Sequence, residues 1–146
     1  MMEAGRPQLI MMPWQVAQII DQARAARPEE ACGLLAGRDG RVERIYPLPN
    51  TERSPVRYLA DPQAQVDAML EIEERGDEVV GIYHSHLDAP AYPSATDVAM
   101  AAYPDAVHLI VSLTRRDSPV LGAFHIRDGD IEEVDIVIKS AERVKQ

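Results

Sequence analysis

The sequence contains very little cysteine and no long apolar run, and both absences restrict what the protein can be. Its single cysteine, Cys32, cannot form an internal disulfide or a cysteine-rich zinc site. No window holds 18 uninterrupted apolar residues, and Pro13 interrupts the apolar run near the start. Neither a signal peptide nor a membrane-spanning helix is therefore expected. These absences predict a cytoplasmic protein that does not bind a membrane.

Runs of basic residues are absent as well. The 146 residues carry 24 acidic and 15 basic side chains, which gives a net charge of −9 at pH 7. A surface this acidic repels nucleic-acid phosphates, so no nucleic-acid partner is expected. The 46% hydrophobic and 27% charged content is typical of a globular protein. With no internal repeat, linker or low-complexity segment, the sequence predicts a single α/β domain.

Apolar periodicity predicts alternating strands and helices along this domain, which spans residues 1–146. Helices are expected over residues 13–27, 61–75 and 94–103. Strands are expected over residues 8–12 (at a sheet edge), 31–37, 42–48, 56–60, 79–86, 107–113, 119–126 and 131–138. The core is expected to span about residues 8–138, and the charged tail over 140–146 is expected to fray.

The expected strand over residues 79–86 ends in a His-x-His pair, His84 and His86. Residues i and i+2 of a strand point to one face with Cα atoms roughly 6–7 Å apart, so both imidazoles can reach one metal ion. Asp97, near the start of the third helix, offers an oxygen ligand. Three protein ligands with one open position are typical of catalytic zinc sites. Such a site also needs a general base, for which Glu30 is the candidate.

Several of these residues also have a purely structural interpretation. The segment from Ser94 to Asp97 matches a helix capping box, in which a serine at the helix start pairs with the acidic residue three positions later. A histidine on a strand often serves packing alone. Structural roles are expected for the other polar candidates, Cys32, Ser85, His108 and His125.

Other histidine-based metal motifs do not fit the sequence. A metallo-β-lactamase-type site would need a histidine at position 89, which is Ala89. A nucleobase deaminase needs a Pro-Cys-x-x-Cys segment, which one cysteine cannot supply. The His-Glu-x-x-His motif of other zinc peptidases is absent.

The combined pattern resembles the signature of the JAMM (MPN-plus) metalloproteases. That signature is an upstream glutamate, then His-[Ser/Thr]-His, seven residues, Ser, two residues and Asp. The segment over residues 30–35 also resembles the family's Glu-x-Cys-Gly-hydrophobic stretch. The resemblance covers residues 12–138 and implies the family's fold, a mixed β-sheet flanked by helices with a cytidine-deaminase-like architecture. The matching residues are Glu30, His84, Ser85, His86, Ser94 and Asp97.

The resemblance implies a zinc-dependent peptidase that hydrolyses an amide or isopeptide bond. His84, His86 and Asp97 would bind one zinc ion per chain, with water in the fourth position. Glu30 would take a proton from that water and later protonate the departing amine. Ser94 would donate a hydrogen bond to the oxyanion.

Within the family, the chain looks most like the short bacterial branch. Residues 50–58 resemble that branch's Asn-x-x-x-Ser-Pro-x-x-Tyr stretch. Members of the branch remove cysteine or another extension from the tail of small ubiquitin-like sulfur carriers that end in Gly-Gly, and the resemblance implies such a carrier as substrate and partner. Leu87 follows the second histidine, where deubiquitinases commonly have proline, which argues against deubiquitinase activity.

Two alternatives stay open at this point. The first is a non-catalytic MPN scaffold that binds partners, although the complete signature argues against it. The second is a metallopeptidase that acts on peptidoglycan or phage-related peptides. The sequence does not assign an oligomeric state, the particular carrier or the released group. It also assigns no role to five loop residues, Asn50, Ser54, Tyr58, Asp88 and Tyr92.

Overall fold

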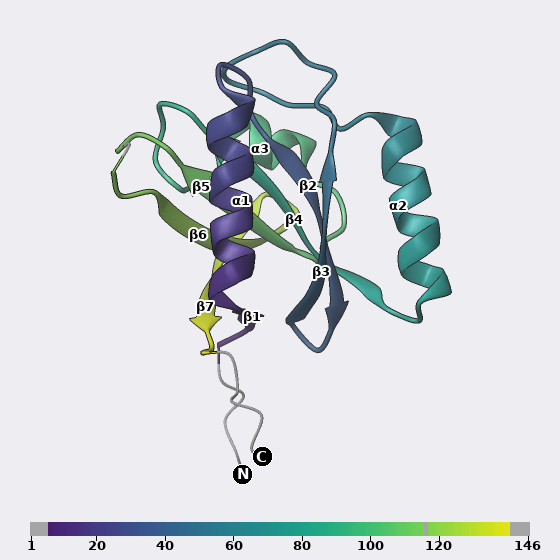
Figure 1. The fold of residues 1–146 in the computed structure, drawn as a ribbon. Coiled ribbons are helices and arrows are strands. Elements are labelled where there is room, and N and C mark those ends of the chain that lie inside the picture. The colour runs from purple at the N-terminus through teal and green to yellow at the C-terminus, as the bar shows by residue number, and fades with distance from the viewer. Residues whose placement is uncertain (1–5, 116, 141–146) are drawn as a thin grey trace.

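The computed structural model describes residues 6–115 and 117–140 (Figure 1). None of the helices in this part of the chain is long and apolar enough to cross a membrane. The elements in chain order are β1 (Gln8–Met11), α1 (Pro13–Ala26), β2 (Cys32–Arg38), β3 (Arg41–Leu48), α2 (Pro62–Glu74), β4 (Glu78–His86), α3 (Ala95–Met100), β5 (Val107–Ser112), β6 (Val120–Arg127) and β7 (Asp130–Ile138).

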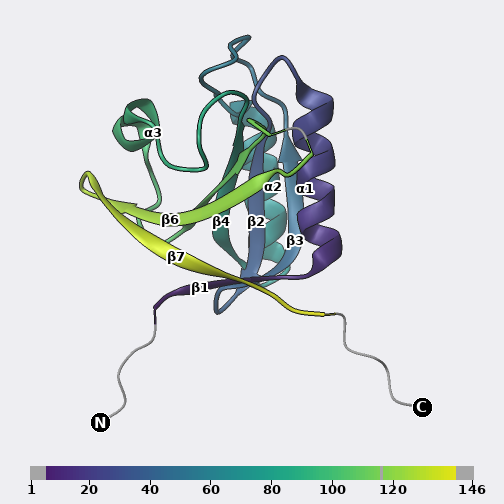
Figure 2. The same cartoon turned by 90° about the vertical axis from the view of Figure 1, so that its left-hand side faces the viewer.

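The strands form one mixed sheet that closes on itself in the order β1-β3-β2-β4-β5-β6-β7 (Figure 2). β1 is parallel to both β3 and β7, and β4 is parallel to β5. The other four pairs are antiparallel. The predicted mixed sheet flanked by helices is confirmed. The prediction that β1 lies at a sheet edge is wrong, because β3 and β7 pair with its two sides.

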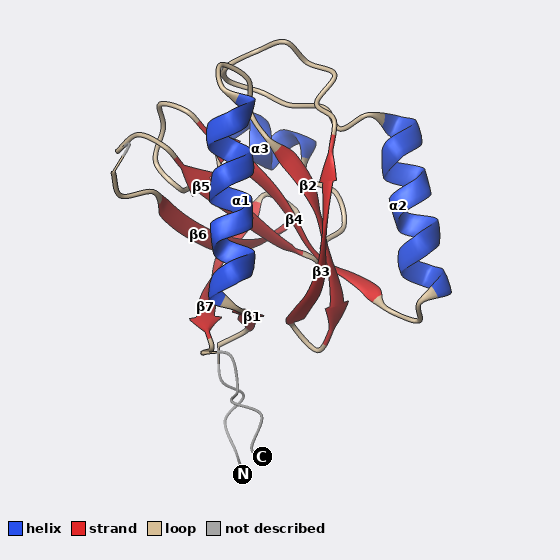
Figure 3. Ribbon diagram, in the orientation of Figure 1, coloured by secondary structure: helices blue, strands red, loops and turns tan. Residues whose placement is uncertain are grey.

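Helices α1 and α2 pack against opposite faces of this sheet (Figure 3). Side chains of β2 alternate between the two faces, as a strand requires. Leu35 packs in the cluster that contains Ile19 of α1. Its neighbour Leu34 packs in the cluster that contains Ile72 of α2. This two-sided burial explains why the segment over residues 31–37 is apolar without interruption.

The two Asp-Gly pairs make tight hairpin turns. Asp39 and Gly40 have φ values of 53° and 73°, and Asp128 and Gly129 have φ values of 50° and 83°. Two consecutive positive φ values are the signature of the type I′ turn, whose twist matches that of the flanking strands. These turns set the pairing of β2 with β3 and of β6 with β7.

Two further predictions of secondary structure from the sequence are wrong. The expected strand over residues 56–60 is a loop, which makes only one isolated bridge, between Asn50 and Ala60. The third helix ends at Met100 rather than at residue 103, and Tyr103 has a φ of 59°. Tyr103 precedes Pro104, and the residue before a proline avoids the right-handed helical region. Of the tail expected to fray, residues 141–146 lie outside the described residues.

The start of α2 allows a test of local stability. The Asp61 carboxylate accepts a hydrogen bond from the Ala64 amide at 2.9 Å. Asp61→Ala removes this helix cap, and we expect the free energy of unfolding to fall by about 1 kcal/mol. Asp67→Ala, on the exposed side of the same helix, is the matched control and is expected to change it by less than about 0.5 kcal/mol. Urea unfolding measures both, and equal losses would contradict a capping role for Asp61.

Candidate metal centre

The pairing of β2 with β4 brings two distant segments of the chain together. Cys32 lies opposite His84 in this antiparallel pair. One residue further along, the Ala31 amide donates to the Ser85 hydroxyl oxygen at 2.8 Å, and the Ser85 amide donates to the Ala31 carbonyl at 3.0 Å. These two bonds extend the register to the residue before β2.

The same register places Glu30 opposite His86. Because side chains alternate along a strand, Glu30 and Cys32 lie on the face that carries His84 and His86. Ser85 points to the other face, where it is buried and bonded to the backbone, as the sequence predicts. The candidate base and two candidate ligands therefore share one side of the sheet.

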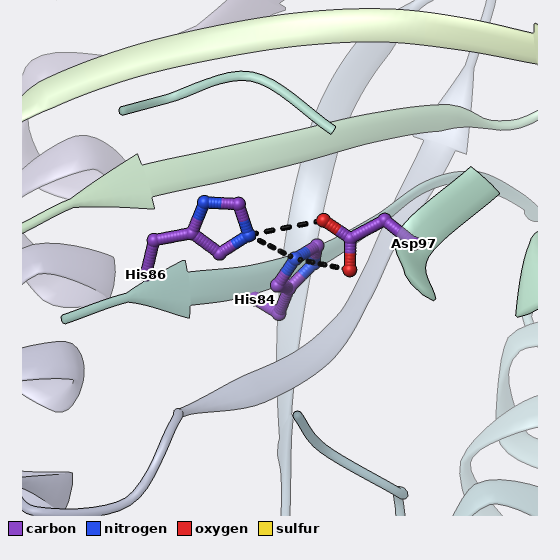
Figure 4. Close-up of side chains that lie close together, drawn as sticks. All are labelled: His84, His86 and Asp97. Carbon is purple, nitrogen blue, oxygen red and sulfur yellow. Dashed lines mark hydrogen bonds and ion pairs between the residues drawn. The ribbon is translucent and has the colours of Figure 1, made fainter. Parts of the chain in front are cut away.

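Three candidate ligands converge on one point (Figure 4). The Nε2 atoms of His84 and His86 are 3.1 Å apart. One Asp97 oxygen, Oδ1, lies 3.2 Å from the His84 nitrogen, and the other, Oδ2, lies 3.0 Å from the His86 nitrogen. Asp97 reaches this point from α3, eleven residues beyond the end of β4. Helix α3 and strand β4 thus form the cluster together.

The His86 ring is oriented by the loop that follows β4. Its Nδ1 lies 2.8 Å from the Pro90 carbonyl, to which it donates. A ring with its proton on Nδ1 presents the lone pair of Nε2, which is the atom that faces the cluster. The preceding carbonyl, of Ala89, accepts hydrogen bonds from the Ser112 hydroxyl at 2.7 Å and the Thr114 hydroxyl at 3.1 Å. The end of β5 therefore holds the segment that orients His86.

The His84 ring is held by stacking. The Tyr58 ring lies against it with the centroids 4.6 Å apart and an angle of 23° between the planes. His84 is 2% exposed, and this burial lowers its pKa. Its Nδ1 is buried without a hydrogen-bond partner among the described residues. A neutral ring in this position offers Nε2 as a ligand.

Asp97 is positioned by the predicted capping box, which the structure confirms. The Asp97 amide donates to the Ser94 hydroxyl oxygen at 3.0 Å, and the Ser94 amide donates to Asp97 Oδ2 at 2.9 Å. Burial raises the pKa of Asp97, but its contacts with the His84 and His86 rings and with the Ser94 amide outweigh it, so the net shift is downward. Because the Ser94 oxygen acts as an acceptor here, its hydroxyl hydrogen is left to donate elsewhere.

Glu30 is the other titrating group of the site. It is 3% exposed, and burial raises its pKa to about 7. His86 lowers this pKa and Asp97 raises it, so the carboxyl group lies within electrostatic range of both. A buried carboxyl group with a pKa near neutrality is suited to both accepting and releasing a proton.

The donor set fits a divalent metal ion. Ligand atoms of His84, His86 and Asp97 all lie within 4.8 Å of one another. Two imidazole nitrogens that face each other at 3.1 Å are readily explained by a cation that both can bind. Two histidines and one carboxylate are ligands that zinc accepts, and they leave a further coordination position free.

Comparison with known proteins identifies the family. The family described as prokaryotic homologs of the JAB domain matches residues 15–125. The chain belongs to this family. The match contains β2, β4 and α3, and therefore every residue of the cluster and Glu30.

Named relatives of this JAB-family chain include peptidases. It is 41% identical over 120 residues to the CysO-cysteine peptidase of Mycobacterium tuberculosis, a match that covers 81% of this chain and 82% of the relative. It is 44% identical over 88 residues to a desampylase of Haloferax volcanii, which covers 58% and 63%. A solution structure from Desulfitobacterium hafniense, 38% identical, has a TM-score of 0.83 and covers 91% of this chain and 94% of that one.

The other residues that the sequence singles out are not part of this cluster. Cys32 is buried, and burial raises its pKa to about 12, which leaves a protonated thiol rather than a nucleophile. His108 and His125 are buried but are not part of the ligand cluster. Asp88 is exposed, and the Tyr92 ring packs edge-on against Phe124 with the centroids 5.2 Å apart.

The loop residues left without a role now have defined contacts. Asn50 donates to the Glu30 carbonyl at 2.9 Å, and Ser54 accepts from the Val56 amide in a local turn. Tyr58 contacts His84 directly. Sequence reasoning did not single out Ser112, because a serine at the end of an apolar strand carries no signal of its contact with a distant loop.

Ser112 offers a test of how the loop after β4 orients its ligand. Ser112→Ala removes the 2.7 Å bond to the Ala89 carbonyl and loosens the segment that holds His86. We expect the affinity for a divalent metal ion to fall about tenfold, the lower end of the effect of residues that orient ligands. Chelator competition measures it, with Ser118→Ala, at an exposed serine, as the control. Unchanged affinity in Ser112→Ala would show that Thr114 alone holds the loop.

Proposed function

We propose that the protein is a zinc-dependent peptidase that cleaves an amide bond at the C-terminal tail of a small ubiquitin-like carrier protein. The observation that carries the proposal is the buried Glu30 carboxyl group on the same face as the cluster of His84, His86 and Asp97. Family membership supports it, as do relatives named as a CysO-cysteine peptidase and a desampylase. We also propose that the protein is located in the cytoplasm, as the sequence predicts.

The proposal assigns the three clustered side chains as ligands of one zinc ion per chain. When bound, zinc supplies Lewis acidity and lowers the pKa of a water molecule toward neutrality. His86 is prepared for this role by its bond to the Pro90 carbonyl, and His84 by its neutral ring. Asp97 contributes a carboxylate that stays ionised at neutral pH.

Glu30 and Ser94 are assigned to the proton transfers and the oxyanion. The Glu30 carboxylate accepts a proton from the attacking water and then gives it to the nitrogen of the departing amine. Its pKa of about 7 in the metal-free site makes both steps accessible near neutral pH. The Ser94 hydroxyl donates a hydrogen bond to the oxyanion, and one such donor is typically worth about 10²–10³ in rate.

The surroundings of the cluster support an extended peptide tail as substrate. A cleft of about 290 Å³ adjoins His84 and Asp97. Its other walls are mostly apolar and come from residues 57–60, α3 and the β2–β4–β5 part of the sheet. Because both histidines and Glu30 are almost fully buried, residues without side chains next to the scissile bond would reach them most easily. A Gly-Gly tail meets that requirement, and the released group would be cysteine or another C-terminal extension.

The assay that tests this proposal uses a carrier protein with a short extension after its Gly-Gly tail. We expect zinc-loaded protein to release the extension, as detected by mass spectrometry, and chelation of zinc to abolish release. Glu30→Gln should lower kcat by at least about 10² while zinc stays bound, because it removes the base and retains the side-chain shape. Glu29→Gln, one residue away, is the matched control and should retain activity.

Two outcomes of this assay would contradict the proposal in different ways. Cleavage that continues in Glu30→Gln or without zinc would refute the mechanism. A protein that binds about one zinc ion yet releases nothing from any carrier would refute the substrate class. In that case the metal centre would still be tested by zinc loss in His84→Ala and Asp97→Ala.

The raised pKa of Glu30 also predicts a pH dependence. A general base must be deprotonated, so protonation of Glu30 at low pH lowers kcat/KM. A bound divalent cation favours the carboxylate and shifts this pKa below its metal-free value of about 7. We therefore expect kcat/KM to rise with pH and to level off at or below about pH 7. A profile that instead rises only above pH 8 would show that another group limits the reaction.

A further inference from the structure

The side chain of Asn50 forms hydrogen bonds with two segments of the site that lie far apart in the sequence. Its Nδ2 donates to the backbone carbonyl of Glu30 at 2.9 Å. Its Oδ1 accepts from the amides of Glu52 and Leu59, both at 2.9 Å. A primary amide has two donor hydrogens and two acceptor lone pairs, so Asn50 uses three of these four positions at once.

The first of these contacts holds the candidate base. The backbone around Glu30 lies just before β2, where regular strand pairing has not begun. The Glu30 carbonyl and the Ala31 amide belong to one peptide group, and Asn50 donates to the carbonyl while the amide donates to Ser85 of β4. On the other side of Glu30, the Glu29 amide donates to the Ala26 carbonyl at 2.9 Å. Asn50 and Ser85 thus fix both edges of the peptide group that follows the Glu30 Cα.

The other contacts close the loop over residues 51–59. Thr51 bonds the Leu59 carbonyl through its amide at 2.8 Å and its hydroxyl at 3.0 Å, beside the Asn50 bond to the Leu59 amide. This loop presents Tyr58, whose ring stacks on His84. Residues 57–60 also line the cleft beside the cluster. The Asn50 amide group is therefore a direct link between the Glu30 backbone and the loop that forms this cleft wall.

We propose that Asn50 is a positioning residue that holds the Glu30 backbone and the Tyr58 loop at a fixed spacing across the metal centre. This inference rests on the proposed function for its kinetic consequences. Asn50 does not touch the ligands, so its loss should leave the metal site filled. It should change the placement of the base and of the substrate cleft, where displacements of about 1 Å can cost up to about 10² in rate.

Two substitutions of Asn50 can distinguish its bond to the Glu30 carbonyl from its bonds to the loop over residues 51–59. Asn50→Asp keeps an oxygen that accepts from Glu52 and Leu59, but it has no hydrogen to donate to the Glu30 carbonyl. Asn50→Ala removes both sets of bonds. Thr51→Val, in the same loop, removes only the hydroxyl bond to the Leu59 carbonyl and serves as the matched control.

The kinetic test uses zinc-loaded variants and a carrier with a C-terminal extension. We expect kcat to fall about tenfold or more in both Asn50 variants, with zinc content unchanged. KM for the carrier should rise in Asn50→Ala only, because only this variant releases the cleft wall. Thr51→Val should stay within about twofold of the wild type. A lower melting temperature with unchanged kcat would reduce Asn50 to a loop-stabilising residue and overturn the proposal.

Amide hydrogen exchange tests the same proposal without any substrate. Exchange at Ala31, next to the base, should accelerate at least about tenfold in both Asn50 variants. Exchange at Leu59 should accelerate in Asn50→Ala and stay slow in Asn50→Asp. If wild-type protein cleaves no carrier, the proposed function fails while this pattern still decides the role of Asn50. Unchanged exchange at Ala31 in both variants would overturn the proposed positioning role of Asn50, whatever the activity.

Discussion

The antiparallel register between β2 and β4 is the constraint on which the site depends. Cys32 opposite His84, and the two bonds between Ala31 and Ser85, put Glu30 beside the histidine pair. A slip of one residue would turn Glu30 to the other face of the sheet, because side chains alternate along a strand. Such a slip would also break the bond between the Ala31 amide and the Ser85 hydroxyl oxygen.

Burial then gives the clustered groups their chemistry. The same exclusion of water raises the pKa of Glu30 and lowers that of His84, so burial shifts both groups toward their neutral forms. Asp97 stays ionised because its contacts with the two imidazole rings and the Ser94 amide outweigh its own burial. An ionised carboxylate beside two imidazoles suits a site that binds a divalent cation, and the buried Glu30 carboxyl group can move a proton nearby.

Much of this could be predicted from local patterns. The His-x-His spacing on an apolar strand, the Ser-x-x-Asp capping box and the Asp-Gly turns each depend on interactions within a few residues, and all three lie where they were expected. Two of the errors arose where distant partners decide the outcome. β1 lacks an edge because β3 and β7 flank it, and residues 56–60 form a loop in which the Leu59 amide donates to the Asn50 side chain rather than to a neighbouring strand.

The sequence by itself determined which residue types are available and on which face of its own element each one lies. Family resemblance added the link between Glu30 and the histidines, although no local pattern connects residues more than fifty positions apart. Only the tertiary structure decided how these faces meet. It did so through hydrogen bonds between segments that lie far apart in sequence. Ala31 bonds to Ser85 of β4, Asn50 bonds to the Glu30 carbonyl, and Ser112 bonds to Ala89 in the loop after β4. Hydrogen bonds of this kind depend on strand register and loop path, which no single segment encodes.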